Sequence, residues 1–448
     1  MPRDLGRSDV ETLVSEQGWQ IPASLDTELD ALLAEPLTAD RAVRFVLINN
    51  PGLQAEMARL GFGAAEVYAA SRLSNPRFGG SWLESDQAGE GTQRSLELAL
   101  PFAELLTLPA RTRMAKLEFA ALKSSVANAV IVAATDAGIA FYQLVADIRV
   151  QDIRARRAKA AQLAADLAAR FHAAGNINDR ELAEQRAAAA QAQLEQLDSD
   201  AQVHSSRARL AGLLGLSMAA NWQVDTTLTR PPAAERGLEE LVALARQQRL
   251  DLAAARTQAD VMAQRLGFTR WSRWLGDVDL GIEREREADG ARRRGPSLEL
   301  EIPLFNQHRD DLWAADAGLA EAVAHLNALI FEVENGVRLA YAGVENARLR
   351  VATYQDNLMP ARANVVARTQ EEVNFMLTGV FKLLDVKGEE LAAQEGYLQS
   401  LSGYWIARAE LARAVGTSLP ATPGEVVEMD SPSQDGGHQH HHNHGDSP

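Results

Sequence analysis

The chain has 448 residues, a formal net charge of −16 and no cysteine. The acidic balance argues against a nucleic-acid partner, since phosphate binding needs a basic face. The lack of cysteine excludes disulfides, thiolate metal sites and a cysteine nucleophile.

No apolar run approaches 18 residues, so the sequence predicts no membrane-spanning helix. Residues 1–36 form a polar lead-in without the apolar region of a signal peptide. The chain is therefore expected either to be cytosolic or to be exported by a signal that precedes this sequence.

The first half begins with a helical pattern from Thr38 to about Leu73, interrupted at Asn50-Pro51. A β-hairpin is predicted at about 75–102, where leucines alternate with polar or small residues. A long helical hairpin is predicted over 110–214. Its glycine turn is followed by Asn178, which with Glu181 fits a capping box for the second helix.

A linker at 221–237 contains a proline pair and leads to the second half. There a helix from Leu238 precedes a second β-hairpin at about 277–304 and a second long helical hairpin at 306–416. We expect a bend in it at Pro360 at most. The tail, 419–448, is polar and rich in histidine and is predicted to be disordered.

The halves repeat one another, so we predict one structural repeat over 37–220 and a second over 238–418. Three landmarks recur at offsets of 202, 204 and 201 residues, in the same order. They are Leu96–Phe102 with Leu298–Leu304, Phe171–Gly175 with Phe375–Gly379, and Leu210–Gly215 with Leu411–Gly416. A unit this long indicates a duplicated half-molecule rather than a short solenoid repeat.

The predicted strands are apolar on one face and polar on the other. Two small sheets packed on the helices of a soluble protein would explain this, as would strands in a bilayer with apolar side chains towards lipid. Four strands cannot close a barrel, for which roughly 8 are needed. A membrane protein of this kind must therefore oligomerise, and three copies would supply twelve strands.

In this order of elements the chain resembles the TolC-like outer-membrane factor family over about residues 37–418. The residues that carry the resemblance are Asn50-Pro51-Gly52-Leu53, Pro101, Pro303, Phe171 with Gly175, Phe375 with Gly379, Pro360, and the closing Leu-x₄-Gly of each half. The resemblance implies a mainly α protomer with a small β part. It further implies a homotrimer with a 12-stranded barrel in the bacterial outer membrane and a long periplasmic helical barrel.

The resemblance also implies a function and partners. We expect a passive exit channel of a tripartite efflux system, served by a periplasmic adaptor and an inner-membrane pump of the RND type, and no enzyme or required cofactor. A type I secretion duct and a soluble periplasmic coiled-coil scaffold or adaptor are the alternatives. Many members of the family are lipoproteins anchored through an N-terminal cysteine; this sequence has none, which leaves lipidation open.

Several carboxylates are candidates for function. The resemblance places a channel gate at the helix tips, where Asp385 matches a family acid, Glu389 lies beside a second family position held here by Gly388, and Glu371 and Glu372 precede the tip. At the offset of 204, Asp385 corresponds to Glu181. A solvated helical Asp is the alternative. Contact with the adaptor is expected at Gly175, Asn176, Gly379 and Val380, and the barrel lumen at Glu97, Glu299 and Glu301.

The histidine-rich tail is a candidate for weak binding of transition-metal cations. Its imidazoles are spaced densely enough to bind Cu²⁺, Ni²⁺ or Zn²⁺, and a purification tag is the alternative. A native tail would favour the heavy-metal branch of the family and efflux of such cations. The residues are His438, His440, His441, His442 and His444.

Overall fold

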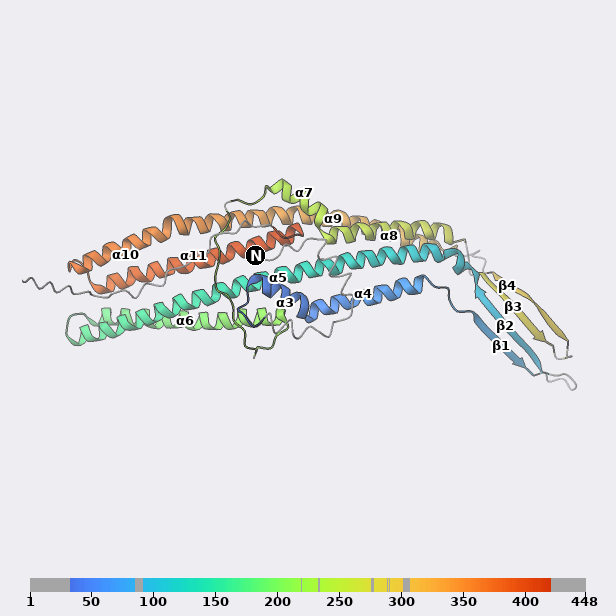
Figure 1. Ribbon diagram of the computed structural model, residues 1–448, viewed down its shortest axis with the longest axis horizontal. Helices are drawn as coiled ribbons and strands as arrows, with labels where there is room; N and C mark the ends of the chain where they lie inside the picture. The colour runs from blue at the N-terminus through green and yellow to red at the C-terminus, as the bar shows by residue number, and fades with distance from the viewer. Residues whose placement is uncertain are drawn as a thin grey trace, which may run out of the picture.

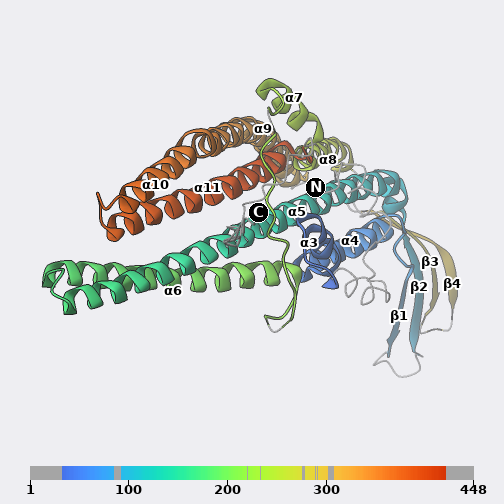
Figure 2. The same cartoon turned by 60° about the vertical axis from the view of Figure 1, so that its left-hand side comes forward.

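The computed structural model describes residues 33–84, 92–218, 220–232, 234–274, 278–287, 289, 291–300 and 307–419. The molecule is elongated, with a four-stranded sheet at one end and helical tips at the other (Figure 1). The predicted fold class of the protomer, mainly helical with a small antiparallel β part, is confirmed. Both long helical hairpins point away from the strands (Figure 2).

The two halves contain the same order of elements. The first half consists of α3 (Ala39–Asn49), α4 (Pro51–Ala70), β1 (Arg77–Leu83), β2 (Gln93–Pro101), α5 (Phe102–Ala173) and α6 (Asp179–Leu214). The second consists of α7 (Leu238–Gln248), α8 (Leu250–Ser272), β3 (Val278–Arg286), β4 (Arg292–Leu300), α9 (Arg309–Ala352), the π-helix η1 (Thr353–Leu358), α10 (Met359–Asn374) and α11 (Val380–Val415).

The first helical hairpin begins earlier than the sequence predicts. Helix α5 starts at Phe102, directly after β2, and passes through Pro109 instead of starting behind it. A proline inside a helix removes one backbone hydrogen bond. Here it falls near the start of a 72-residue helix, which continues past it to Ala173.

Helix α5 bears on the prediction that the sequence contains no membrane-spanning helix. It contains an 18-residue window with a mean hydropathy of 1.6, long and apolar enough by composition to cross a membrane. Yet α5 packs against α3, α4, α6, α8 and α11, which bury Ala137, Leu144 and neighbouring apolar side chains. These helix contacts bury 44% of the apolar window.

The second helical hairpin departs from regular geometry before Pro360. The six residues of η1 are wound as a π-helix, which makes room for the proline two residues after it. Tyr354 of this segment packs against Gly396 of α11, where a Cβ atom would lie 2.4 Å from the tyrosine hydroxyl. In place of the bend expected at Pro360, the structure therefore has a π-helical segment whose Tyr354 packs against Gly396.

The two helical tips share one geometry at an offset of 201 residues, not 204. Gly175 has φ +76° and Met376 has φ +57°, the left-handed conformation that ends a helix. Asn176 N–H donates to the Phe171 carbonyl, and Leu377 N–H donates in the same way to Glu372. Gly379 therefore corresponds to the helix N-cap Asn178, so the sequence match of Phe171–Gly175 with Phe375–Gly379 is wrong by three residues.

In each half, the C-terminal end of the last helix packs against the junction between the first two helices. This joins α6 to the α3–α4 junction and α11 to the α7–α8 junction. Gly215 ends α6 with φ +69°, and Asn49 and Asn50 side-chain amides donate to the Leu214 and Leu213 carbonyls at 2.8 and 2.7 Å. Gly416 ends α11 with φ +79°. There the Arg249 guanidinium donates to the Ala414 carbonyl at 2.9 Å. The unpaired carbonyls at the equivalent ends of α6 and α11 are therefore hydrogen-bonded by different types of side chain.

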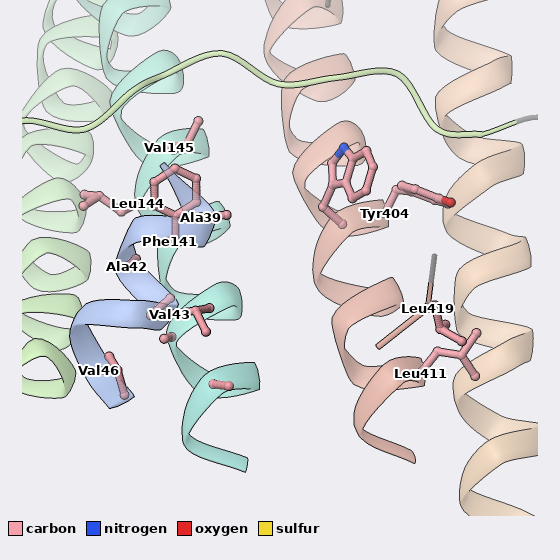
Figure 3. Packing of buried hydrophobic residues seen from close by; sticks show 14 of the residues in the cluster. Ala39, Ala42, Val43, Val46, Phe141, Leu144, Val145, Tyr404, Leu411 and Leu419 are labelled. Atoms are coloured by element: carbon pink, nitrogen blue, oxygen red, sulfur yellow. The ribbon is translucent and has the colours of Figure 1, made fainter. Parts of the chain in front are cut away.

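One core joins the two halves. Figure 3 shows Ala42 and Val46 of α3 beside Phe141 and Leu144 of α5, with Tyr404 of α11 across from them. These side chains belong to one contiguous buried cluster that also includes valines of α9.

The linker between the halves is tied to α11 by a buried polar cluster. Arg408 pairs with Glu235 at 2.7 Å, with side chains only 10% and 6% exposed, and it donates to the Leu419 carbonyl at 3.0 Å. The Tyr404 hydroxyl donates to the same Glu235 carboxylate at 2.6 Å. Burial, aided by this carboxylate, raises the pKa of Tyr404, so the phenol stays neutral.

The glycine contact at the end of α6 gives a stability prediction. Gly215→Ala should lower the unfolding midpoint, because it forces alanine into a left-handed conformation and places Cβ 2.6 Å from the Asn49 carbonyl oxygen. We expect the free energy of unfolding to fall by about 1–3 kcal/mol. Thermal unfolding followed by far-UV circular dichroism measures it.

Gly212→Ala is the matched control, since it lies in the same last turns of α6 with no atom within 4 Å of the new Cβ. It should leave the midpoint unchanged or raise it, because alanine favours the helix. Equal midpoints for Gly215→Ala and Gly212→Ala would contradict the proposed role of this contact.

Candidate functional site

The sheet has two faces of opposite character. Its strands run in the order β1-β2-β3-β4, all antiparallel, and the pairing places Phe78, Leu98 and Ile282 in one row across three strands. Because side chains alternate along a strand, all even-numbered strand residues share this face. It carries exposed apolar side chains: Phe78, Trp82, Leu96, Leu98, Leu100, Leu280, Ile282, Leu298 and Leu300.

The opposite face of the sheet collects the carboxylates. Glu97 of β2 and Glu299 of β4 lie there, as the lumen prediction requires, and border a hollow of about 630 Å³. The hollow is also lined by Arg77 and Asp279, which form a salt bridge between β1 and β3. Glu301 lies outside the described residues. Arg77 and Asp279 are not among the residues predicted for the lumen, although each alternates with an apolar neighbour.

Both outer strands of the sheet have an open edge. Among the described strands, β1 pairs only with β2 and β4 pairs only with β3. Every residue of β1 is exposed. An open edge carries unpaired backbone N–H and C=O groups, which can pair with a strand of another chain.

The junction between sheet and helices is held by Glu104 in the first turn of α5. Its carboxylate accepts hydrogen bonds from the Ser74 hydroxyl at 2.8 Å and the Ser74 backbone N–H at 3.1 Å. Arg111 lies 3.6 Å away. The hydrogen bonds from Ser74 hold the pKa of Glu104 below its usual value, with a smaller contribution from Arg111. They attach the segment before β1 to the start of α5.

The two helical tips differ in their chemistry. Gly175, Asn176 and Gly379, predicted to contact an adaptor, are exposed, and Val380 is half-buried. The second tip also exposes Phe375, Met376 and Leu377, with Met376 93% accessible. At the offset of 201, the first tip holds Ala174, Gly175 and Asn176 in their place. This apolar tip was not predicted from the sequence, because the alignment of the two halves was displaced by three residues there.

The predicted gate residues occupy different environments. Asp385 is exposed in the first turns of α11, and Glu389 forms a salt bridge with Arg362 of α10. Glu371 pairs with Arg368 at 2.9 Å within α10, and Glu372 is exposed. The structure does not bring the four carboxylates into one cluster within a single chain.

With the offset of 201 residues, a different residue of the first half is equivalent to Asp385. At the offset of 201 the corresponding residue is Glu184, not Glu181, whose side chain belongs to the capping box of α6. Glu184 forms a salt bridge with Arg180 one turn before it. The equivalent positions on the two hairpins therefore both carry a carboxylate.

A charged cluster connects the two helical hairpins above the tips. Arg154 of α5 donates to Glu395 of α11 at 2.6 Å, and this carboxylate is only 11% exposed. Arg157 bridges Glu195 of α6 at 3.2 Å and Glu395 at 3.6 Å. Neither arginine was predicted from the sequence to join the two hairpins, because an arginine in a helix usually lies on the solvent-exposed surface.

The histidine-rich tail, with His438, His440, His441, His442 and His444, lies outside the described residues. Within the described ranges, no group of three or more His, Asp or Glu side chains has the geometry to hold a metal ion.

No family model and no curated protein matches the sequence. Solved structures do match. The outer-membrane channel OprN superimposes with a TM-score of 0.71 at 17% identity, over 86% of this chain and 91% of OprN.

Two further solved structures superimpose on this chain to a similar extent. The Campylobacter jejuni CmeC outer membrane channel gives a TM-score of 0.70 at 15% identity, covering 84% of this chain and 85% of CmeC. The outer membrane protein VceC from Vibrio cholerae gives 0.67 at 18% identity, covering 85% and 96%. The chain has the TolC-like fold of these proteins.

The junction at Glu104 yields a pH prediction. Because the folded-state pKa of Glu104 is lowered, its interaction with Ser74 stabilises the protein above the unfolded-state pKa, near 4.5, and is lost as pH falls through the folded value. Ser74→Ala should therefore lower the thermal midpoint at pH 7. The difference from the parent protein should shrink steadily below pH 4.5.

Ser71→Ala is the control, because the Ser71 hydroxyl donates only to the Tyr68 carbonyl within its own helix end. Its effect on the midpoint should not depend on pH. A Ser74→Ala difference of constant size from pH 7 to pH 3 would contradict the role assigned to Glu104.

Proposed function

We propose that this chain is the protomer of a homotrimeric channel in the bacterial outer membrane, a passive exit for substrates of a tripartite efflux system. The observation that carries the proposal is the sheet with an exposed apolar face, a carboxylate face and two open edges. It stands at one end of helices on the order of 100 Å long, at about 1.5 Å per residue.

Trimerisation supplies what the single sheet lacks. In a bilayer, backbone groups at a sheet edge have no water to bond with, so a spanning sheet must close on itself. Since β1 and β4 run antiparallel, β1 of one protomer can pair with β4 of the next. Three four-stranded sheets then form a 12-stranded barrel, with Leu98 and Ile282 towards lipid and Glu97 and Glu299 towards the lumen.

The helical end suits contact with a periplasmic adaptor and, through it, an inner-membrane pump of the RND type. The two tips project furthest from the sheet (Figure 1). An apolar tip at Phe375–Leu377 beside a tip of small and polar residues at Ala174–Asn176 offers an alternating surface around a trimer. Removal of Phe375, Met376 and Leu377 from water would favour docking of an apolar partner surface.

The exported substrate class is a separate proposal. Transition-metal cations are one candidate, on the strength of the histidine-rich tail and of the carboxylates proposed to line the lumen. A type I secretion system would use the same protomer with a different pump. The soluble scaffold is disfavoured by the sheet, where Ile282 and Leu298 are 66% and 65% exposed with no covering element among the described residues.

Planar-bilayer recording tests the proposal directly. The protein, extracted in detergent and added to a lipid bilayer, should give discrete conductance steps and should migrate as a trimer. A protein that stays soluble and monomeric without detergent and gives no current would instead be a scaffold.

A second recording tests the gate. Asp385→Ala should raise the conductance or relieve block by divalent cations, because a ring of three carboxylates at a narrow tip attracts cations. Glu184→Ala is the control at the equivalent position of the first hairpin. Currents and ion selectivity unchanged by Asp385→Ala, or changed equally by both variants, would contradict a gate at Asp385.

A further inference from the structure

Five arginines share the apolar face of the sheet at the end away from the helices. Arg94, Arg286 and Arg292 lie opposite one another on β2, β3 and β4, next to the hairpin loops. Arg284 and Arg294 form the next row, one step closer to the helices. All five have the same parity as Leu98 and Ile282, so they continue the apolar face.

The five arginines lie beside one another, and none of their cross-strand partners is a carboxylate. Residues directly opposite on neighbouring strands lie about 5 Å apart, and like charges at that spacing repel. All five are exposed, and none forms a salt bridge with a carboxylate in the described part of the chain. No strand position on this face carries Asp or Glu. Trp82 completes the outermost row on β1.

The opposite face has the complementary pattern. Arg293, between Arg292 and Arg294 in β4, faces the carboxylate side and pairs with Glu287 at 2.9 Å. The strand acids all lie on that side: Glu97, Asp279, Glu283, Glu285 and Glu299. The strand acids are thus confined to one face, which also carries Arg77 and Arg293, while the five arginines on the other face have no acid beside them in the strands and are open to an anion from outside the sheet.

We propose that these five arginines, the arginine belt, bind phosphate groups of anionic lipids in the outer leaflet. The inference rests on the proposed function, in which the apolar face contacts lipid and the helices lie in the periplasm. Arginine is costly at the centre of a bilayer and nearly free at its interface, so the belt belongs at the headgroups. The sheet end opposite the helices then reaches the outer leaflet.

The chemistry of the belt favours phosphate. A guanidinium presents parallel N–H donors that bind phosphate oxygens in pairs, and its long side chain can extend from an apolar surface to a polar layer. Two rows of arginines spaced along and across the strands can engage a lipid that carries more than one phosphate. Trp82 suits the same interface.

Lipid retention by the purified trimer tests the arginine belt. The probes are detergent micelles containing either diphosphorylated lipid A or the same lipid with its phosphates removed, and native mass spectrometry counts the lipids retained per trimer. We expect at least about a tenfold preference for the phosphorylated lipid in the parent protein, weakened by added salt.

The combined variant Arg284→Gln, Arg286→Gln, Arg292→Gln and Arg294→Gln should reduce this preference to within about twofold. Arg293→Gln, on the other face of β4, is the matched control and should keep it. Since four substitutions can disturb folding, the same positions changed to lysine provide a second variant. It keeps the charge and should retain an intermediate preference.

Three results would overturn the lipid site. They are equal retention of both lipids by the parent protein, an equal loss in Arg293→Gln, and inorganic phosphate displacing the lipid at equal concentration, which would indicate a site for free anions. Channel conductance of the parent protein in phosphatidylcholine bilayers separates the two proposals. Conductance with equal lipid retention contradicts the lipid site alone, whereas a protein that enters neither micelles nor bilayers contradicts both.

Discussion

The open edges of the sheet are the constraint on which the proposed structure depends. Each protomer contributes four strands whose apolar side chains point to one side and whose outer strands lack a partner among the described residues. In water such a sheet would associate through its edges and its apolar face. In a bilayer it must close, since unpaired backbone groups are costly there. The proposed trimer would close the edges by pairing β1 with β4 of a neighbouring protomer, and lipid would cover the apolar face.

The helical part obeys a different rule, the satisfaction of helix ends. Each half ends with a left-handed glycine seated on the first helical break of the same half, and the exposed carbonyls are bonded by asparagines in one half and by Arg249 in the other. This arrangement fixes the base of each long hairpin within its own half, while the buried core around Phe141 and Tyr404 joins the two halves. Between the core and the tips, the Arg154–Glu395 contact joins one hairpin to the other, and the rings of Phe171 and Phe381 meet again at the tips with centroids 5.9 Å apart. Motion of one tip relative to the other would have to break the Phe171–Phe381 contact.

Much of this fold could be predicted from the sequence because its signals are local. Alternating leucines located the hairpins to within a few residues, and the Asn178–Glu181 capping box was found as expected. The register of the second tip was not predictable in this way. There Met376 takes the left-handed conformation that a glycine usually holds, so matching glycine to glycine displaced the alignment by three residues. Asp385 was consequently paired with Glu181 instead of Glu184.

Features that depend on pairing between distant segments were also missed. The arginine belt exists only because β2, β3 and β4 align Arg94, Arg286 and Arg292, and no single strand reveals it. The salt bridge of Arg77 with Asp279 likewise joins residues about 200 positions apart. The gate carboxylates stay a prediction, because a ring of Asp385 side chains requires three chains.

Disulfide cross-linking between protomers tests the central claim most directly, and the chain contains no cysteine to interfere. Ser81→Cys in β1 would be combined in turn with a cysteine at one lumen-facing position of β4: Arg293, Gly295, Ser297 or Glu299. The account predicts that one combination gives a covalent trimer on gel electrophoresis without reductant, while each single variant stays unlinked. Failure of all four combinations, or linkage into dimers or open ladders without a closed trimer, would contradict it.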